Sequence, residues 1–347
     1  MVKALLYALL AASAASGAFA AQKATPPAGS PLDPKATKAA PPAETGLGRE
    51  LPSPYSANVE SKLLPPAGRN VDVAYGAYQR GRYNAAFREA TKRVETNAKD
   101  AAALTLLGEL YNQGLGVRQD PKRALEWYRL AAAQGEPHAM ASLGLMALDG
   151  RGGPKDQKAG RTWLDQAAEK GEPSACYNLA LLLLGTGTEG DAAKAATFFR
   201  KAAEAEIAPA QYALGVLFAK GRGVAADPEK AAEWLRRAAD NGDLSGEVEF
   251  AILLFNGKGV PKDEARAARY FLHAAKRGNA IAQNRIALLY LNGRGVPANR
   301  VEAAAWNLAA TAQGRSDAAM DQKLADLSAE ERSKAERLAA DRANLQP

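Results

Sequence analysis

Residues on which most catalytic and metal sites depend are scarce in this chain. It has one cysteine and two histidines in 347 residues, so an intrachain disulfide is excluded. His138 and His273 stand far apart in the sequence, and neither belongs to an HxxxE or HExxH spacing, which disfavours a zinc site or a His-based triad. Cys176 falls on an apolar helical position, as is typical of a small core residue. We therefore expect no enzyme activity, no metal and no cofactor.

The surplus of positive over negative side chains is also small. Lys and Arg number 45 and Asp and Glu 38, which gives a net charge of +7, and the two signs alternate along the chain. Nucleic-acid binding calls for basic residues gathered on one face with aromatic side chains on which bases stack, but only 7% of the residues are aromatic. The composition predicts a solvated surface of mixed sign and no nucleic-acid partner.

Long apolar runs are missing except for a short one at the N-terminus. Residues 1–20 have the form of a secretory signal peptide, with Lys3, an apolar stretch over 4–15 and a small-x-small cleavage site at 18–20. This pattern predicts Ala21 as the mature N-terminus, no transmembrane segment after cleavage, and export to the bacterial periplasm. No cysteine follows the cleavage site, which excludes a lipoprotein anchor. A signal peptide that is retained as an anchor is the alternative.

The next segment has the composition of a linker. Residues 21–68 are rich in Pro, Ala, Gly and Lys and show neither helical nor alternating apolar spacing. Such a segment buries too little apolar surface to offset the entropy of ordering it. We predict a disordered Pro/Ala-rich linker.

A repeat organises the stretch 100–314. One glycine recurs at steps of 36, 35, 36, 36 and 36 residues, at Gly114, Gly150, Gly185, Gly221, Gly257 and Gly293. An aromatic residue keeps the same steps, at Trp127, Trp163, Phe198, Trp234, Tyr270 and Trp306, and so does an acid or amide, at Asp120, Asp156, Asp191, Asp227, Asp263 and Asn299. A fixed period in this range is typical of a solenoid built from six similar units.

Each unit predicts two helices. Residues 101–111 are apolar at helical spacing, and Gly114 follows where a left-handed residue can end a helix. Asp120 is a predicted N-cap with Pro121 at the first helical position of a helix that runs to Ala133. In this second helix we expect four inward residues: Ala124, Trp127, Leu130 and Ala131. The small residue of each second helix should allow close helix packing, with the aromatic residue filling the core beside it.

The unit resembles the Sel-one-like repeat (SLR) of the tetratricopeptide-repeat clan. The motif reads L-G-E-L-Y-N-Q-G-L-G-V-R-Q-D-P-K-R-A-L-E-W-Y-R-L-A-A-A-Q-G from Leu107. The resemblance implies an all-α fold, a right-handed solenoid of stacked antiparallel helix pairs. The third unit departs from the pattern, because it has lost a residue before Gly185 and carries Glu206 where the closing glycine is expected.

Both ends of the repeat array have candidate caps. Residues 70–99 are similar to one tetratricopeptide-type hairpin without the Gly-x-Gly turn, which we interpret as an N-terminal cap. Residues 315–347 contain a short helix and a charged helix that begins with a capping box at Ser328. A C-terminal cap is the favoured interpretation, and a detached helix that binds a partner is the alternative.

A binding surface is the function that these observations leave. The residue before each Leu-Gly-type pair varies while its neighbours repeat, as on a concave face formed by the first helices. The polar residues expected in this groove are Asn178, Glu249, Asn284 and Arg285. Bracing of neighbouring helices is the alternative role for each of them.

The resemblance implies a non-catalytic scaffold, adaptor or regulator that binds another protein or peptide of the cell envelope. Two other functions stay open, a secreted effector that acts on host proteins and, less favoured, an envelope enzyme.

Overall fold

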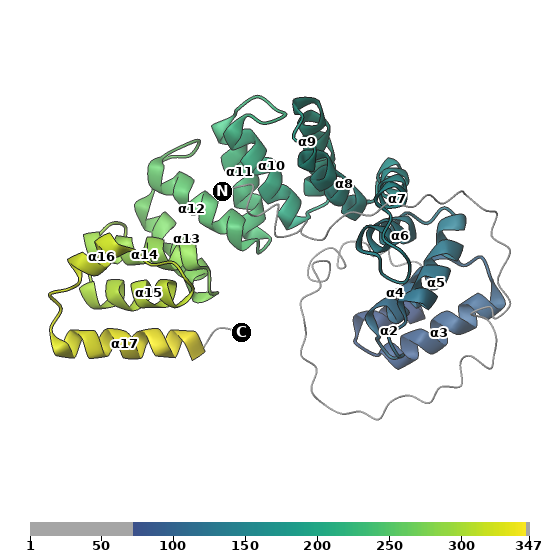
Figure 1. Cartoon of the computed structure of the whole chain (residues 1–347), viewed down its shortest axis with the longest axis horizontal. Coiled ribbons are helices and arrows are strands. Elements are labelled where there is room, and N and C mark those ends of the chain that lie inside the picture. The colour runs from purple at the N-terminus through teal and green to yellow at the C-terminus, as the bar shows by residue number, and fades with distance from the viewer. Residues whose placement is uncertain (1–71, 345–347) are drawn as a thin grey trace. The chain divides into compact units, whose positions relative to one another are not determined.

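A computed structural model describes residues 72–344, and every regular element in this range is a helix (Figure 1). The predicted signal peptide and linker lie outside the described residues. The helices are α2 (Val73–Gln79), α3 (Tyr83–Thr96), α4 (Ala101–Gln113), α5 (Pro121–Ala133), α6 (Pro137–Asp149), α7 (Gln157–Glu169), α8 (Pro173–Gly185), α9 (Glu189–Glu204), α10 (Ala208–Lys220), α11 (Pro228–Asp240), α12 (Leu244–Asn256), α13 (Glu264–Lys276), α14 (Ala280–Asn292), α15 (Arg300–Ala312), α16 (Ala318–Lys323) and α17 (Ala329–Asn344).

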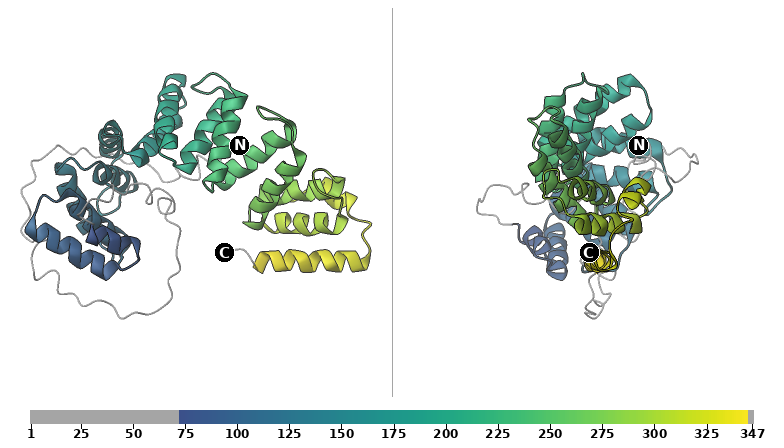
Figure 2. Two further views of the ribbon diagram at one scale, coloured as in Figure 1. Left: turned by 180° about the vertical axis from the view of Figure 1, so that it is seen from behind. Right: turned by 90° about the vertical axis from the view of Figure 1, so that its left-hand side faces the viewer.

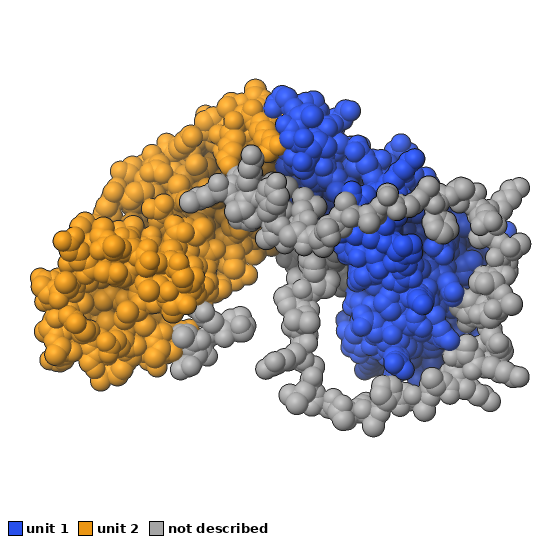
Figure 3. Space-filling view, in the orientation of Figure 1, with its two compact units in different colours: residues 1–202 blue, residues 203–347 orange. Residues whose placement is uncertain are grey.

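The chain divides into two compact units, residues 1–202 and 203–347 (Figure 3). In both units the two helices of a repeat pack against each other, as in α4 with α5 and α10 with α11. Within each unit, second helices also pack against the first helix of the next repeat, as α5 does with α6 and α13 with α14. This succession of pairs is the α-solenoid expected from the sequence.

The second helices begin at the predicted caps. The Asp120 carboxylate accepts hydrogen bonds from the backbone N–H groups of Lys122 and Arg123, each at 3.1 Å. Asp156, Asp227, Asp263 and Asn299 cap α7, α11, α13 and α15 in the same way. Asp191 differs, because it lies inside α9 and donates its N–H to Thr188 Oγ1 at 3.1 Å. Helix α9 begins at Glu189, two residues before Asp191, so Thr188 takes the capping role in the third repeat.

The glycines that follow the first helices behave as their spacing predicts, except in the third repeat. Gly114 ends α4 with φ of 75°, and equivalent left-handed glycines end α6, α10, α12 and α14. Gly185 is still helical, and α8 ends at Thr186 in the right-handed region. In the turn after α9, where the other repeats have a glycine, Glu206 takes the glycine conformation with φ of 67°. It is the one non-glycine residue with positive φ among those described. An L-residue in this region pays a steric cost that glycine avoids.

The second glycine of the turn allows neighbouring repeats to approach. Gly259 has φ of 73°, and a Cβ atom placed on it would lie 2.0 Å from the carbonyl oxygen of Pro228, at the start of the preceding second helix. Gly295 makes the same approach to Glu264. A side chain here would force the two repeats apart.

The column of small residues is buried in all six repeats, as expected: Ala124, Gly160, Ala195, Ala231, Ala267 and Ala303. The aromatic column is only partly buried. Trp127 and Trp306 are 3% and 2% exposed, whereas the other four are intermediate. The residue one position later is buried in every repeat: Tyr128, Leu164, Phe199, Leu235, Phe271 and Asn307.

Leu130 corrects a second expectation, because it is 36% exposed instead of facing the core. On a helix one position turns a side chain by about 100°. The face of α5 that packs on its neighbours is centred on Tyr128. Leu130 follows Tyr128 by two positions, so its side chain points away from this face and lies at the surface.

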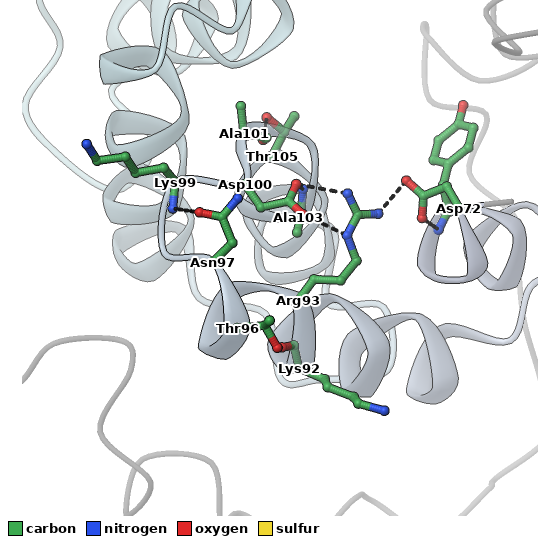
Figure 4. Close-up of polar contacts among 11 residues, drawn as sticks. Asp72, Lys92, Arg93, Thr96, Asn97, Lys99, Asp100, Ala101, Ala103 and Thr105 are labelled. Carbon is green, nitrogen blue, oxygen red and sulfur yellow. Dashed lines mark hydrogen bonds and ion pairs between the residues drawn. The ribbon is translucent and has the colours of Figure 1, made fainter. Parts of the chain in front are cut away.

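The helices at the two ends are held by arginines. Arg93 on α3 binds Asp100 through two 2.9 Å hydrogen bonds and forms a 2.6 Å ion pair with Asp72, so it joins the N-caps of α4 and α2 (Figure 4). Helix α17 runs beside α15 (Figures 1 and 2). Arg342 on α17 donates to Glu302 at 2.6 Å and lies 3.9 Å from the centroid of the Trp306 ring. These contacts hold α17 against α15.

Candidate functional site

The position before the Leu-Gly-type pair differs in exposure from repeat to repeat. Leu106 is buried, and Ser142, Asn178 and Ala213 are half-buried. Glu249 on α12 and Arg285 on α14 are exposed. Charged side chains therefore occupy this position only in the two repeats that follow α11.

Two of the predicted groove residues bond within the fold. Asn178 Nδ2 donates to the carbonyl oxygen of Ser174, one turn earlier on α8, at 2.8 Å. Asn284 is 6% exposed, and its Nδ2 donates to Asp317 Oδ2 at 3.2 Å. Asp317 is the N-cap of α16, where it accepts from the N–H of Met320, and the hydrogen bonds from Asn284 and Met320 lower the pKa of its carboxyl. Asn284 thus braces the C-terminal helices.

The other two belong to a charged row in residues 203–347. We define this first-helix row as Tyr212 and Lys220 on α10, Glu249 on α12 and Arg285 on α14. The Glu249 side chain is exposed as a whole, but nearby protein atoms partly desolvate its carboxyl and raise the pKa, while the positive charges of Lys220 and Arg285 oppose the rise. Burial and the neighbouring carboxylates of Glu249 and Asp243 raise the pKa of Tyr212 to about 12. These shifts place the members of the row within electrostatic reach of one another.

Sequence reasoning missed a buried polar column beside this row. Gln211, Glu247 and Gln283 stand near the start of α10, α12 and α14 at steps of 36 residues and are 0%, 3% and 0% exposed. The constant spacing was a usable signal, and so was the change from glutamine to glutamate at one position. The matching position of the earlier repeats holds Cys176, Met140 and Leu104.

The glutamines of this column tie consecutive helices together. Gln211 Nε2 donates to the carbonyl oxygen of Ala203 at 3.1 Å, and its Oε1 accepts from Asn241 at 2.9 Å. Gln283 makes the same two bonds, to Ala275 at 3.2 Å and from Gln313 at 2.9 Å. Each glutamine therefore bridges the end of the preceding second helix and the end of its own.

The histidines and the cysteine are arranged in ways that do not form a triad in the described residues. His138 Nδ1 lies 3.6 Å from Glu172 Oε1, and the Ser174 hydroxyl donates to that same carboxylate oxygen at 2.7 Å, so the serine proton faces the acid. Cys176 is buried, and burial raises the pKa of its thiol. Within residues 72–344, no group of three or more His, Cys, Asp or Glu side chains is placed to hold a metal ion.

Membrane spans were also sought among the described helices. None of them is both long and apolar enough to cross a bilayer.

Solved structures similar to this chain are themselves repeat proteins. A Sel1 repeat protein from Oxalobacter formigenes is 29% identical with a TM-score of 0.58, over 70% of this chain and 97% of that chain. A protective antigen of uropathogenic Escherichia coli with an SLR fold is 27% identical with a TM-score of 0.49, over 78% of this chain and 67% of that chain. No match is found among the curated proteins.

The Sel1 repeat family matches the chain six times, at residues 101–136, 137–172, 173–206, 208–243, 250–279 and 280–314. These segments cover more than half of the sequence, and each spans a helix pair described above, with the fifth segment beginning inside α12. Repeats of this type generally serve as scaffolds for protein–protein interaction. The six matches and the paired helices together show that the chain belongs to the Sel1 repeat family.

Proposed function

We propose that this protein is a non-catalytic scaffold, adaptor or regulator that binds a partner protein or peptide in the bacterial periplasm. One observation carries the proposal. Glu249 and Arg285 are exposed and of opposite charge at the position that varies on an otherwise repeating frame. Exposed charges on rigid helices suit the recognition of a complementary partner, because a rigid frame reduces the entropy lost on binding.

The binding surface in this proposal is the first-helix row. An Arg guanidinium can bind a partner carboxylate through two parallel hydrogen bonds, and a Glu carboxylate accepts from Lys, Arg or backbone N–H groups. Half-buried Val216, Ile252 and Leu288 pack against the core one turn beyond the variable position and hold the helices in register. Asn178 stays in the proposal as a half-buried member of the other compact unit, and Asn284 is left out because its amide binds Asp317.

The test combines capture and affinity. The double change Glu249→Ala with Arg285→Ala is compared with Glu233→Ala with Arg236→Ala, which removes one exposed acid and one exposed base from α11. Each protein is used to capture partners from envelope extract, and the affinity of the purified partner is then measured. We expect the first pair to weaken binding by tenfold or more, since two hydrogen bonds to charged groups contribute about 1.5–3 kcal/mol each.

The control pair should change the affinity by less than about twofold, because exposed pairs on the second helix contribute little. Equal affinity for both double variants would refute the first-helix row as the binding surface. The compartment is tested separately by fractionation, in which an exported protein found in the culture supernatant instead of the periplasm would favour a secreted effector.

A further inference from the structure

The buried polar column changes chemistry at α12. Glu247 occupies the position at which Gln211 and Gln283 donate a side-chain N–H to the preceding second helix. An ionised carboxylate has no hydrogen to donate, so Glu247 cannot make that bond toward α11. Its Oε1 instead lies 2.7 Å from His273 Nδ1 on α13, and its Oε2 lies 4.0 Å from Arg277 Nη1.

A cavity opens at this altered joint. Its volume is about 330 Å³, and it is lined by residues of α11, α12 and α13: Ala239, Glu247, Arg266, Arg269, Tyr270 and His273. Arg266, Arg269 and His273 are spaced by three and four residues, which places them on one face of α13. Three basic side chains therefore surround one buried acid.

The arginines are available and partly oriented. Neither guanidinium pairs with a carboxylate among residues 72–344, where other arginines of the same unit, such as Arg294 and Arg300, have acidic partners. The Arg266 guanidinium lies 5.6 Å from the ring centroid of Phe250 and 5.8 Å from that of Tyr270. The two rings meet edge to face at 5.3 Å and form a fixed apolar support for this cation.

We propose that this cavity is a second binding site, which takes a side-chain carboxylate of an acidic partner peptide between Arg266, Arg269 and His273. It rests on the proposed function only in that the ligand belongs to a protein. Guanidinium groups match the geometry of a carboxylate, and Tyr270 offers a ring for the adjacent methylene groups. The basic residues of the site all lie on α13, a second helix, whereas the first-helix row lies on α10, α12 and α14.

The buried acid selects the ligand charge. The Glu247 carboxylate lies among the lining residues and repels negative charge, so a singly charged carboxylate is favoured over a doubly charged phosphate. Charge at the cavity must therefore stay close to balance, with the ligand offsetting the excess of basic groups.

Glu247 also orients the imidazole. When His273 Nδ1 holds the proton shared with Glu247, its Nε2 carries a second hydrogen only in the imidazolium form. The charged groups that face this pair are Arg266 and Arg269 from α13, Arg277 at the end of that helix, and Glu247 itself from α12, while α11 contributes the uncharged Ala239.

The test uses a fluorescein-labelled hexaglutamate peptide and the full-length protein in a fluorescence anisotropy titration, with hexaglutamine as the neutral probe. The double change Arg266→Ala with Arg269→Ala is matched by Arg129→Ala with Arg200→Ala, which removes two exposed arginines from α5 and α9. We expect the first variant to lose at least about tenfold in affinity and the control about twofold or less.

Several outcomes of this titration would overturn the proposal. Equal losses in the two double variants would show diffuse charge attraction and overturn the proposal, as would no binding of hexaglutamate or equal binding of hexaglutamine. Stronger competition by inorganic phosphate than by acetate would overturn the assignment to a carboxylate. The proposed function fails separately, through the Glu249 and Arg285 variants.

Discussion

At the scale of single residues, the aromatic column that is recognisable in the sequence lies one helical position before the column that is buried in every repeat. Trp234 is half-buried with the Arg237 guanidinium 4.4 Å from its ring centroid, whereas Leu235 is 2% exposed. A Cβ atom on Gly215 would lie 2.7 Å from Leu235 Cγ, so the facing helix leaves the leucine no free space. The aromatic residue covers the edge of the interface, and its neighbour fills it.

This difference predicts the order of two mutational effects. Leu235→Ala should lower the free energy of unfolding by about 2–5 kcal/mol, because it leaves a cavity in a packed core. Trp234→Ala should cost less, since part of its ring is already in contact with water. Denaturant unfolding of the two variants measures both values. A larger loss for Trp234→Ala would place the aromatic column in the core after all.

A second residue-scale prediction concerns the buried acid of α12. Burial raises the pKa of Glu247, with His273 and Arg277 opposing the rise. A carboxyl whose pKa is raised in the folded state binds protons more readily there than when unfolded, so its favourable contribution is present at low pH and is lost as pH rises through the folded pKa. Glu247→Gln should therefore raise the melting temperature at neutral pH.

The glutamine would also restore the donor found at Gln211 and Gln283. We expect the stabilisation relative to wild type to increase as pH rises above the ordinary pKa of 4.5 for this carboxyl and to shrink below it. Thermal melts at several pH values provide the measurement. A variant that is less stable than wild type at neutral pH would show that the ion pair with His273 outweighs the cost of burying the acid.

At the scale of elements, helix ends are fixed locally, and their packing partners come from more distant sequence. The Ser328 hydroxyl accepts from the N–H of Glu331 at 3.2 Å, and the Glu331 carboxylate accepts from Ser328 N–H, which is the predicted capping box. The attachment of α17 depends instead on Arg342, whose partners Glu302 and Trp306 are on α15.

Arg342→Ala should accordingly loosen the attachment of α17 to α15. It removes a 2.6 Å charge-assisted hydrogen bond and a cation on the Trp306 ring, so we expect a loss of about 1–3 kcal/mol. Arg337→Ala, at an exposed position of the same helix, should change stability by less than about 0.5 kcal/mol. Chemical unfolding and hydrogen exchange of α17 provide the comparison. Equal effects of the two changes would contradict the role of Arg342.

At the scale of the whole molecule, the described core lies within residues 72–344. Deletion of residues 21–68 should therefore leave the helical circular dichroism signal and the cooperative melt unchanged, because the composition of that segment predicts no core of its own. A lower melting temperature for the truncated protein would show that the segment packs against the repeats.

The sequence by itself determined how often the helix pair recurs and, outside the third repeat, where its helices begin and end. These features depend on local chemistry. An Asp or Asn side chain accepts a hydrogen bond from a backbone N–H two or three residues later, a glycine adopts positive φ, and apolar residues recur close to the helical period. Even the irregular third repeat was visible, through the missing residue before Gly185 and through Glu206 at a glycine position.

The tertiary structure decided which faces are buried and which polar residues are already bonded. A rotation of about 100° for each position moved the core from the aromatic column to its neighbour. Asn284 is bound by Asp317, 33 residues away, and Glu247 by His273, 26 residues away, so neither partner follows from the local pattern. Glu249 and Arg285 stay exposed because no helix within residues 72–344 covers them, and only the packed repeats reveal that.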